Sequence, residues 1–107
     1  MSAPNAFKQL EAVGSVSIGV RGYGGVGVQV FGTFSGTVTF EATVDERNWV
    51  ALNMVPSNSA TPASTTTSAG AWTANCSGFA SVRARISTYA SGQFNISVQV
   101  SEAAGRF

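Results

Sequence analysis

The chain has 107 residues, which is enough for one domain with a hydrophobic core but leaves little room for two. Its single cysteine cannot form an internal disulfide, and the absence of histidine removes the commonest general base and zinc ligand. Six basic residues are balanced by five acidic ones, so the charge gives no reason to expect nucleic acid as a partner. No apolar run approaches the ~20 residues of a transmembrane helix, and the first residues lack the basic and apolar regions of a secretion signal. We therefore expect no membrane partner, and a protein that stays where it is translated until it is assembled into something larger.

Apolar residues alternate with polar residues or glycines along most of the chain, which is the period of a strand with one buried face. The clearest case is GTVTFEATV, where Val38, Phe40 and Ala42 alternate with threonines and Glu41. The run at 48–55 is more uniformly apolar and suits a strand that is covered on both faces or paired near a seam. We expect an all-β antiparallel sandwich, jelly-roll-like, of about seven or eight strands. The predicted strands lie within residues 14–20, 25–32, 36–44, 48–55, 68–76, 79–88 and 93–101.

Two stretches break the alternation. Residues 1–14 contain scattered apolar side chains among polar ones, and we interpret them as an arm, or a short helical turn, before a single sandwich domain over 15–107. Residues 56–70 have two prolines, no charge and mostly small polar side chains. They predict one long loop, or a loop flanking a short edge strand.

The stretch RGYGGVG, residues 21–27, has the glycine spacing of the dinucleotide-binding fingerprint. That fingerprint requires a strand before the glycines and a helix after them, whereas these glycines lead into an alternating strand. We interpret the stretch as a hairpin turn, with positive φ at Gly24 and Gly25 and with Tyr23 packed beside the turn. No cofactor is predicted.

Arg83 and Arg85 fall on one face of a predicted strand. Alternate charges on the solvent face of a strand keep a sheet soluble and its edge unpaired, which is the interpretation we favour. The alternative is that either arginine contacts a phosphate or a carboxylate, for example one on a neighbouring subunit.

The carboxylates Glu41, Asp45 and Glu46 are the only group that resembles an acid–base pair or a calcium site. Glu41 is alone on its strand and the other two follow it at a turn, so a solvated hairpin is the better interpretation. Cys76 has no histidine to activate it and is expected to be a buried thiol. We therefore expect no enzyme, no catalytic residue and no metal site.

Two segments resemble a small recurrent module of tailed-bacteriophage virion proteins: GYGGVGVQVFGTFSGTVTFEATVDERNWVAL and, later, SGFASVRARISTYASGQFNISVQVS. The resemblance covers about residues 16–100. One departure is VDERNW, where the family usually has glycine after the aspartate, so the hairpin is expected to differ slightly in shape. The matching residues are Val28, Gln29, Gly32, Thr33, Phe34, Ser35, Gly36, Thr37, Thr39, Phe40, Glu41, Val44, Asp45, Trp49 and Val50, and then Val82, Arg83, Arg85, Ser87, Tyr89, Ser91 and Gly92.

The resemblance implies a virion structural protein, and we expect a capsid decoration or cement protein that forms a homo-oligomer, most simply a trimer. Its partners would be its own copies and other virion proteins such as the major capsid protein. Thr37, Thr39, Glu41 and Thr43 form a flat, weakly charged strand face that suits close protein contact. The residues expected at protein interfaces are Phe7, Leu10, Tyr23, Arg83, Arg85 and Phe107.

Two alternatives remain open. One is a tail adaptor or fibre-associated module of the same virion. The other is a carbohydrate-binding module, in which Tyr23, Trp72 or Tyr89 would stack on a host surface glycan.

Overall fold

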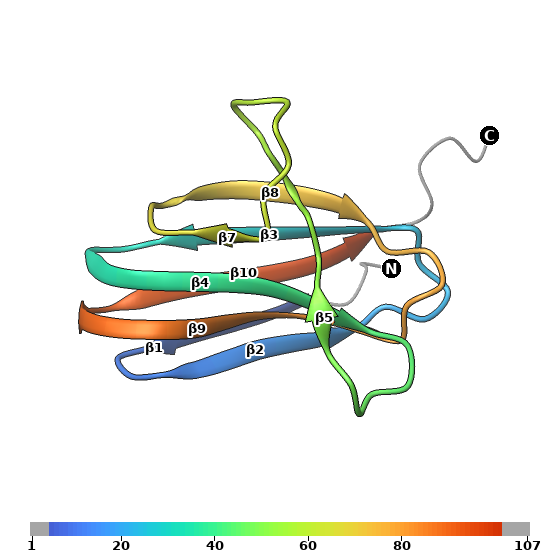
Figure 1. The fold of residues 1–107 in the computed structure, drawn as a ribbon, viewed down its shortest axis with the longest axis horizontal. Helices are drawn as coiled ribbons and strands as arrows, with labels where there is room; N and C mark the ends of the chain where they lie inside the picture. Colours follow the sequence, from blue (N-terminus) through green and yellow to red (C-terminus); the bar gives the residue numbers. More distant parts are fainter. Residues whose placement is uncertain (1–4, 102–107) are drawn as a thin grey trace.

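The computed structural model describes residues 5–101 as two antiparallel five-stranded sheets packed face to face. Figure 1 looks onto sheet B, in which β2, β9 and β4 run side by side, with sheet A behind it. The predicted β-sandwich is confirmed. Sheet A has the order β1 (Asn5–Leu10), β10 (Phe94–Ser101), β3 (Gly25–Phe31), β8 (Gly70–Asn75) and β6 (Val55–Pro56). Sheet B has the order β2 (Gly14–Gly19), β9 (Ser81–Gly92), β4 (Phe34–Thr43) and β5 (Val50–Ala51), with β7 (Thr65–Thr66) also pairing with β4.

The core follows from the alternation. Apolar side chains at every second position of β2, β3, β4 and β10, most of them valine or isoleucine, point between the sheets, where β-branched side chains pack well on a pleated surface. Aromatic rings fill the remaining space: Phe40 packs against Trp72 with ring centroids 5.3 Å apart, and Phe34 stacks on Phe94 at 4.1 Å. Because these pairs join the two sheets, they hold the sandwich together as one core.

The N-terminal segment differs from the expected arm. Residues 5–10 form β1, the edge strand of sheet A, in register with β10 from Asn5 opposite Gln99 to Leu10 opposite Phe94. Leu10 is half-buried against the core, so this part of the segment is built into the sandwich of its own chain. Residues 1–4 lie outside the described part of the structure.

The apolar run at 48–55 was expected to form one strand, but the structure does not contain that strand. It contributes the two-residue strands β5 and β6, which belong to different sheets, so the chain crosses the side of the sandwich between them. Met54, which lies between them, is fully buried, whereas Val50 is exposed. The run shows no alternation because its fully buried residue, Met54, lies between two strands that are each only two residues long.

Residues 57–64 form the loop that projects between β6 and β7 in Figure 1. It is closed at its base by the Met54–Ala63 bridge and is followed by β7, which pairs with β4 at Val38 and Thr39. The loop flanking a short edge strand, one of the two forms predicted for 56–70, is therefore confirmed.

The glycine-rich stretch at 21–27 connects sheet B to sheet A and is not a hairpin. The Tyr23 amide donates to the Val20 carbonyl at 3.0 Å, and the positive φ is at Gly22 (84°), not at Gly24 or Gly25. That combination is the type II turn, which requires positive φ at its third residue. Sequence reasoning chose the wrong glycines because it assumed that the flanking strands pair with each other.

Candidate functional site

One outer surface of the sandwich carries no charged side chain on the described strands. Cross-strand register places the outward residues of sheet A in rows, for example Phe7, Ser97, Gln29 and Ala71. We call this surface the uncharged face. It consists of Asn5, Phe7 and Gln9 from β1, Asn95, Ser97, Gln99 and Ser101 from β10, Gly25, Gly27, Gln29 and Phe31 from β3, Ala71, Thr73 and Asn75 from β8, and Val55 from β6.

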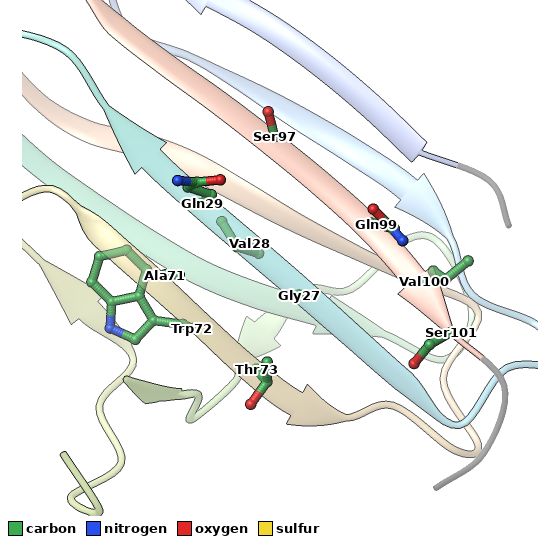
Figure 2. A pocket seen from close by; sticks show the side chains of 10 residues that line it. All are labelled: Gly27, Val28, Gln29, Ala71, Trp72, Thr73, Ser97, Gln99, Val100 and Ser101. Atoms are coloured by element: carbon green, nitrogen blue, oxygen red, sulfur yellow. The ribbon is translucent and has the colours of Figure 1, made fainter. Parts of the chain in front are cut away.

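A shallow groove of about 340 Å³ runs across the middle of the uncharged face. Gly27 lies directly between Gln99 and Thr73 in neighbouring strands, and its missing side chain leaves the depression. Figure 2 shows Gln29 on β3 beside Ser97 and Gln99 on β10. The groove therefore offers amide and hydroxyl groups for hydrogen bonding and no fixed charge.

Two exposed aromatic rings lie at one end of this face. Phe7 is 55% exposed and Phe31 43% exposed, and their ring centroids are 6.3 Å apart across β10. Asn95 lies between these strands, where it accepts a hydrogen bond from the Gln9 amide at 3.1 Å. Large apolar side chains that remain exposed as a pair on a neutral surface are typical of contact sites.

The residues expected at protein interfaces are not gathered in one place. Phe7 is on the uncharged face, and Leu10 and Tyr23 are partly buried against the core. Arg83 and Arg85 project from the opposite face, and Phe107 lies outside the described residues. Sequence reasoning missed Phe31, Gln29 and Gln99, although the absence of charge at every outward position of β3 and β10 was a usable signal.

The opposite surface, the outer face of sheet B, carries an ion-pair cluster. Glu41 accepts from the Nε of Arg83 at 2.7 Å and from the Nε and Nη2 of Arg85, each at 3.1 Å. The hydrogen bond from Arg85, and after it the one from Arg83, lower the pKa of Glu41 against the opposing effect of burial. The bond between Glu41 and Arg85 also raises the pKa of Arg85. Arg83 also lies over the ring of Trp49, 4.2 Å from its centroid. The threonine face expected to be flat is therefore crossed by charged side chains.

The aromatic residues considered for glycan stacking are mostly engaged within the fold. Trp72 is only 6% exposed and packs on Phe40, so little of its ring is available to stack on a glycan. Tyr89 packs at a tilt on Phe94, and its hydroxyl donates to the Gly92 carbonyl at 2.8 Å.

The remaining carboxylates and the thiol have structural partners. Asp45 accepts from the amides of Arg47 and Asn48, and Glu46 pairs with Arg21 at 2.8 Å. Cys76 is fully buried, as expected, and burial raises the pKa of its thiol. Over residues 5–101 no three metal-ligating side chains come together. The same part of the chain contains no helix with the length and apolar character needed to cross a membrane.

No protein-family model matches the sequence, and no curated protein is significantly similar to it. Among solved structures, the SPBc2 prophage-derived protein YomS superposes with a TM-score of 0.74 at 14% identity, over 94% of this chain and 98% of that one. The PBSX exported protein XepA superposes with a TM-score of 0.72 at 25% identity, over 90% of this chain. The matched region is 39% of XepA, so this chain spans about two fifths of that protein. The fold thus relates this chain to proteins of prophage origin.

Proposed function

We propose that this chain is a structural component of a bacteriophage particle that binds other virion proteins through the uncharged face. The observation that carries the proposal is the exposed Phe7–Phe31 pair on a neutral surface of a prophage-type fold. Burying neutral side chains avoids the desolvation of long charged groups, and the cores of protein interfaces are depleted in charge for that reason.

The finer role that we propose is capsid decoration, with the protein acting as a homo-oligomer, such as a trimer, on a preformed head lattice. The resemblance to phage virion modules and the two-sheet sandwich support this role. A tail adaptor or fibre-associated module would use the same surface. Counting copies per particle separates them, because a decoration protein approaches the number of capsid subunits whereas a tail component matches one tail ring.

Phe7→Gln and Phe31→Gln test the surface directly. Each replaces an exposed ring with a polar side chain, so the fold should persist while co-sedimentation with particles lacking the native protein falls by about tenfold or more, as for an interface hot spot. Val13→Gln is the matched control, because Val13 is equally apolar and 67% exposed but lies in the turn between β1 and β2. Unchanged occupancy with both phenylalanine variants would remove the uncharged face from the proposal. Deleting residues 2–13 is a poorer test, since it removes β1 from the sheet.

A glycan-binding function is favoured by one observation, the groove lined by Gln29, Ser97 and Gln99. Amide and hydroxyl groups without charge suit the hydroxyls of a neutral sugar. Saturable binding on a glycan array that Gln29→Ala and Gln99→Ala abolish would support this function over protein adhesion.

A further inference from the structure

We infer that the outer face of sheet B holds a docking site for the carboxylates of an acidic segment of another protein, built from Arg83, Arg85 and Trp49. This site lies on the face opposite to the uncharged one. The inference therefore does not rest on the function proposed above.

The cluster carries more positive charge than its own carboxylate neutralises. Arg83 and Arg85 both bond to one acidic residue, Glu41, which lies on the neighbouring strand β4. A third cation is close by, because the ammonium group of Lys8 donates to the carbonyl of Ser15 at 3.1 Å, and Ser15 pairs with Arg85 in the β2–β9 register. The outward neighbours Ser17 and Thr39 are neutral. The centre of this face is therefore a net positive surface.

The two guanidinium groups are held in place and still have donors to offer. Arg83 bonds Glu41 through Nε alone, and Arg85 bonds it through Nε and Nη2. Within residues 5–101 the remaining terminal nitrogens of both arginines donate to no other group, and the side chains of Arg83 and Arg85 are 24% and 40% exposed. Because Glu41 and the ring of Trp49 already fix both arginines, a bound carboxylate would order few additional groups.

A depression beside Arg85 has the chemistry of a glutamate or aspartate side chain. It measures about 350 Å³ and combines Arg85 and the hydroxyl-bearing Ser15 and Ser87 with apolar walls from Val13 and Ile86. The hydroxyl of Ser87 donates to the Thr37 carbonyl, which leaves Ser15 as the hydroxyl donor nearest the arginine. A carboxylate could bond to Arg85 while its methylene groups rest against Val13.

A second copy of this chain is a poor occupant. A two-fold contact through this face would place arginine near arginine, which is repulsive. Among the described carboxylates, Asp45 caps its own turn, Glu46 pairs with Arg21 and Glu11 accepts from Gln93. The complementary partner is therefore a different protein that presents several carboxylates in one segment.

The test uses the full chain and a hexaglutamate peptide, followed by the two tryptophan indole signals in a ¹H–¹⁵N spectrum. We expect a saturable shift of the Trp49 indole, because Trp49 lies under Arg83, and little change at the buried Trp72. Arg85→Gln should weaken binding by about fivefold, as for an exposed charge pair, and Arg83→Gln combined with Arg85→Gln should abolish the shift. A spectrum otherwise unchanged shows that each variant is folded.

Arg21→Gln is the charge-matched control, because it removes one positive charge that pairs with Glu46 and not with Glu41. It should leave the peptide affinity within about twofold of the original, and so should Phe7→Gln on the other face. The inference is overturned if hexaglutamate does not shift Trp49, or if Arg21→Gln weakens binding as much as Arg85→Gln. It is also overturned if inorganic phosphate or single-stranded DNA binds the site more tightly than the peptide.

Discussion

At the end of β9, Gly92 lies against the backbone where β4 begins. Its φ is +90°, and a Cβ built there would be 2.2 Å from the Thr33 carbonyl oxygen and 2.6 Å from the Cα of Phe34. Both atoms belong to the main chain and cannot rotate away. Gly78 has a similar φ of +92°, but a Cβ there meets nothing within 4 Å. The two glycines therefore share one conformational requirement and differ in steric room.

We predict that Gly92→Ala destabilises the fold much more than Gly78→Ala. The left-handed conformation alone costs a non-glycine residue about 1 kcal/mol. The backbone clash at Gly92 adds roughly 1–3 kcal/mol, as overpacking does. Urea unfolding followed by tryptophan fluorescence measures both variants on one scale. Equal losses would mean that the end of the sandwich relaxes without cost.

Glu46 shows how far single residues can be read from the sequence. It stands where the resembled family has glycine, and its φ of +62° is the left-handed conformation that glycine adopts easily. Its carboxylate bonds to Arg21 and to Ser81. The departure from the family pattern was visible in the sequence. The compensating contacts were not, because they join residues 25 and 35 positions apart.

The connection between β4 and β5 is organised by one carboxylate. Asp45 Oδ1 accepts from the amides of Arg47 at 2.8 Å and Asn48 at 2.9 Å, while Oδ2 accepts from the Asn48 side chain at 2.8 Å. The hydroxyl of Thr43 also donates to Oδ1. These bonds, led by that from the Asn48 amide, hold the pKa of Asp45 well below its usual range.

We predict that Asp45→Asn makes the unfolding free energy less sensitive to acid. A carboxyl with a lowered native pKa stabilises the fold above its unfolded pKa, near pH 4 for aspartate, and the contribution is lost as the pH falls through the native pKa. The difference in stability between the original protein and the variant should therefore be largest at neutral pH and shrink on acidification. Urea unfolding over a pH series measures it. The pKa of Glu41 is also lowered, but Glu41 is present in both proteins, so its contribution to the stability cancels in the difference. A difference in stability that did not change with pH would contradict the prediction.

At the scale of elements, the strands with regular alternation were predictable and those without it were not. β2, β3 and β10 bury every second residue over most of their length, and β4 and β9 do so over 38–42 and 82–86. In β1 the outward position Phe7 is apolar and the inward position Lys8 is charged, which conceals the strand. Lys8 is accommodated because β1 is an edge and its ammonium group reaches the Ser15 carbonyl. β5, β6 and β7 are two residues long, too short to show a period.

At the scale of the whole molecule, the sandwich was predictable but the chemistry of its faces was only partly so. Period-two alternation requires two layers to bury one face of each strand. It does not say which strands share a sheet, so the sequence could not reveal that Phe7 and Phe31 lie together or that Arg83 and Arg85 share Glu41. Folding brings together strands that are distant in sequence, and the result is a neutral outer face on sheet A and a positive outer face on sheet B. Such a division allows one small protein to contact two chemically different partners.

Cys76 offers a measure of how this molecule opens as a whole. Its thiol is fully buried, it contacts the Tyr23 carbonyl at 3.6 Å, and burial raises its pKa. Since the thiolate is the reactive form, labelling by a disulfide reagent should require unfolding.

We predict that Phe40→Ala, which removes a fully buried ring, lowers the free energy of unfolding by about 3–5 kcal/mol. It should then raise the labelling rate by roughly two to four orders of magnitude when reclosing is faster than reaction. Val13→Ala, at an exposed turn, should leave the rate unchanged. An equal rate in Phe40→Ala and the original protein would instead mean that Cys76 is reached by a local opening of the corner between the two sheets.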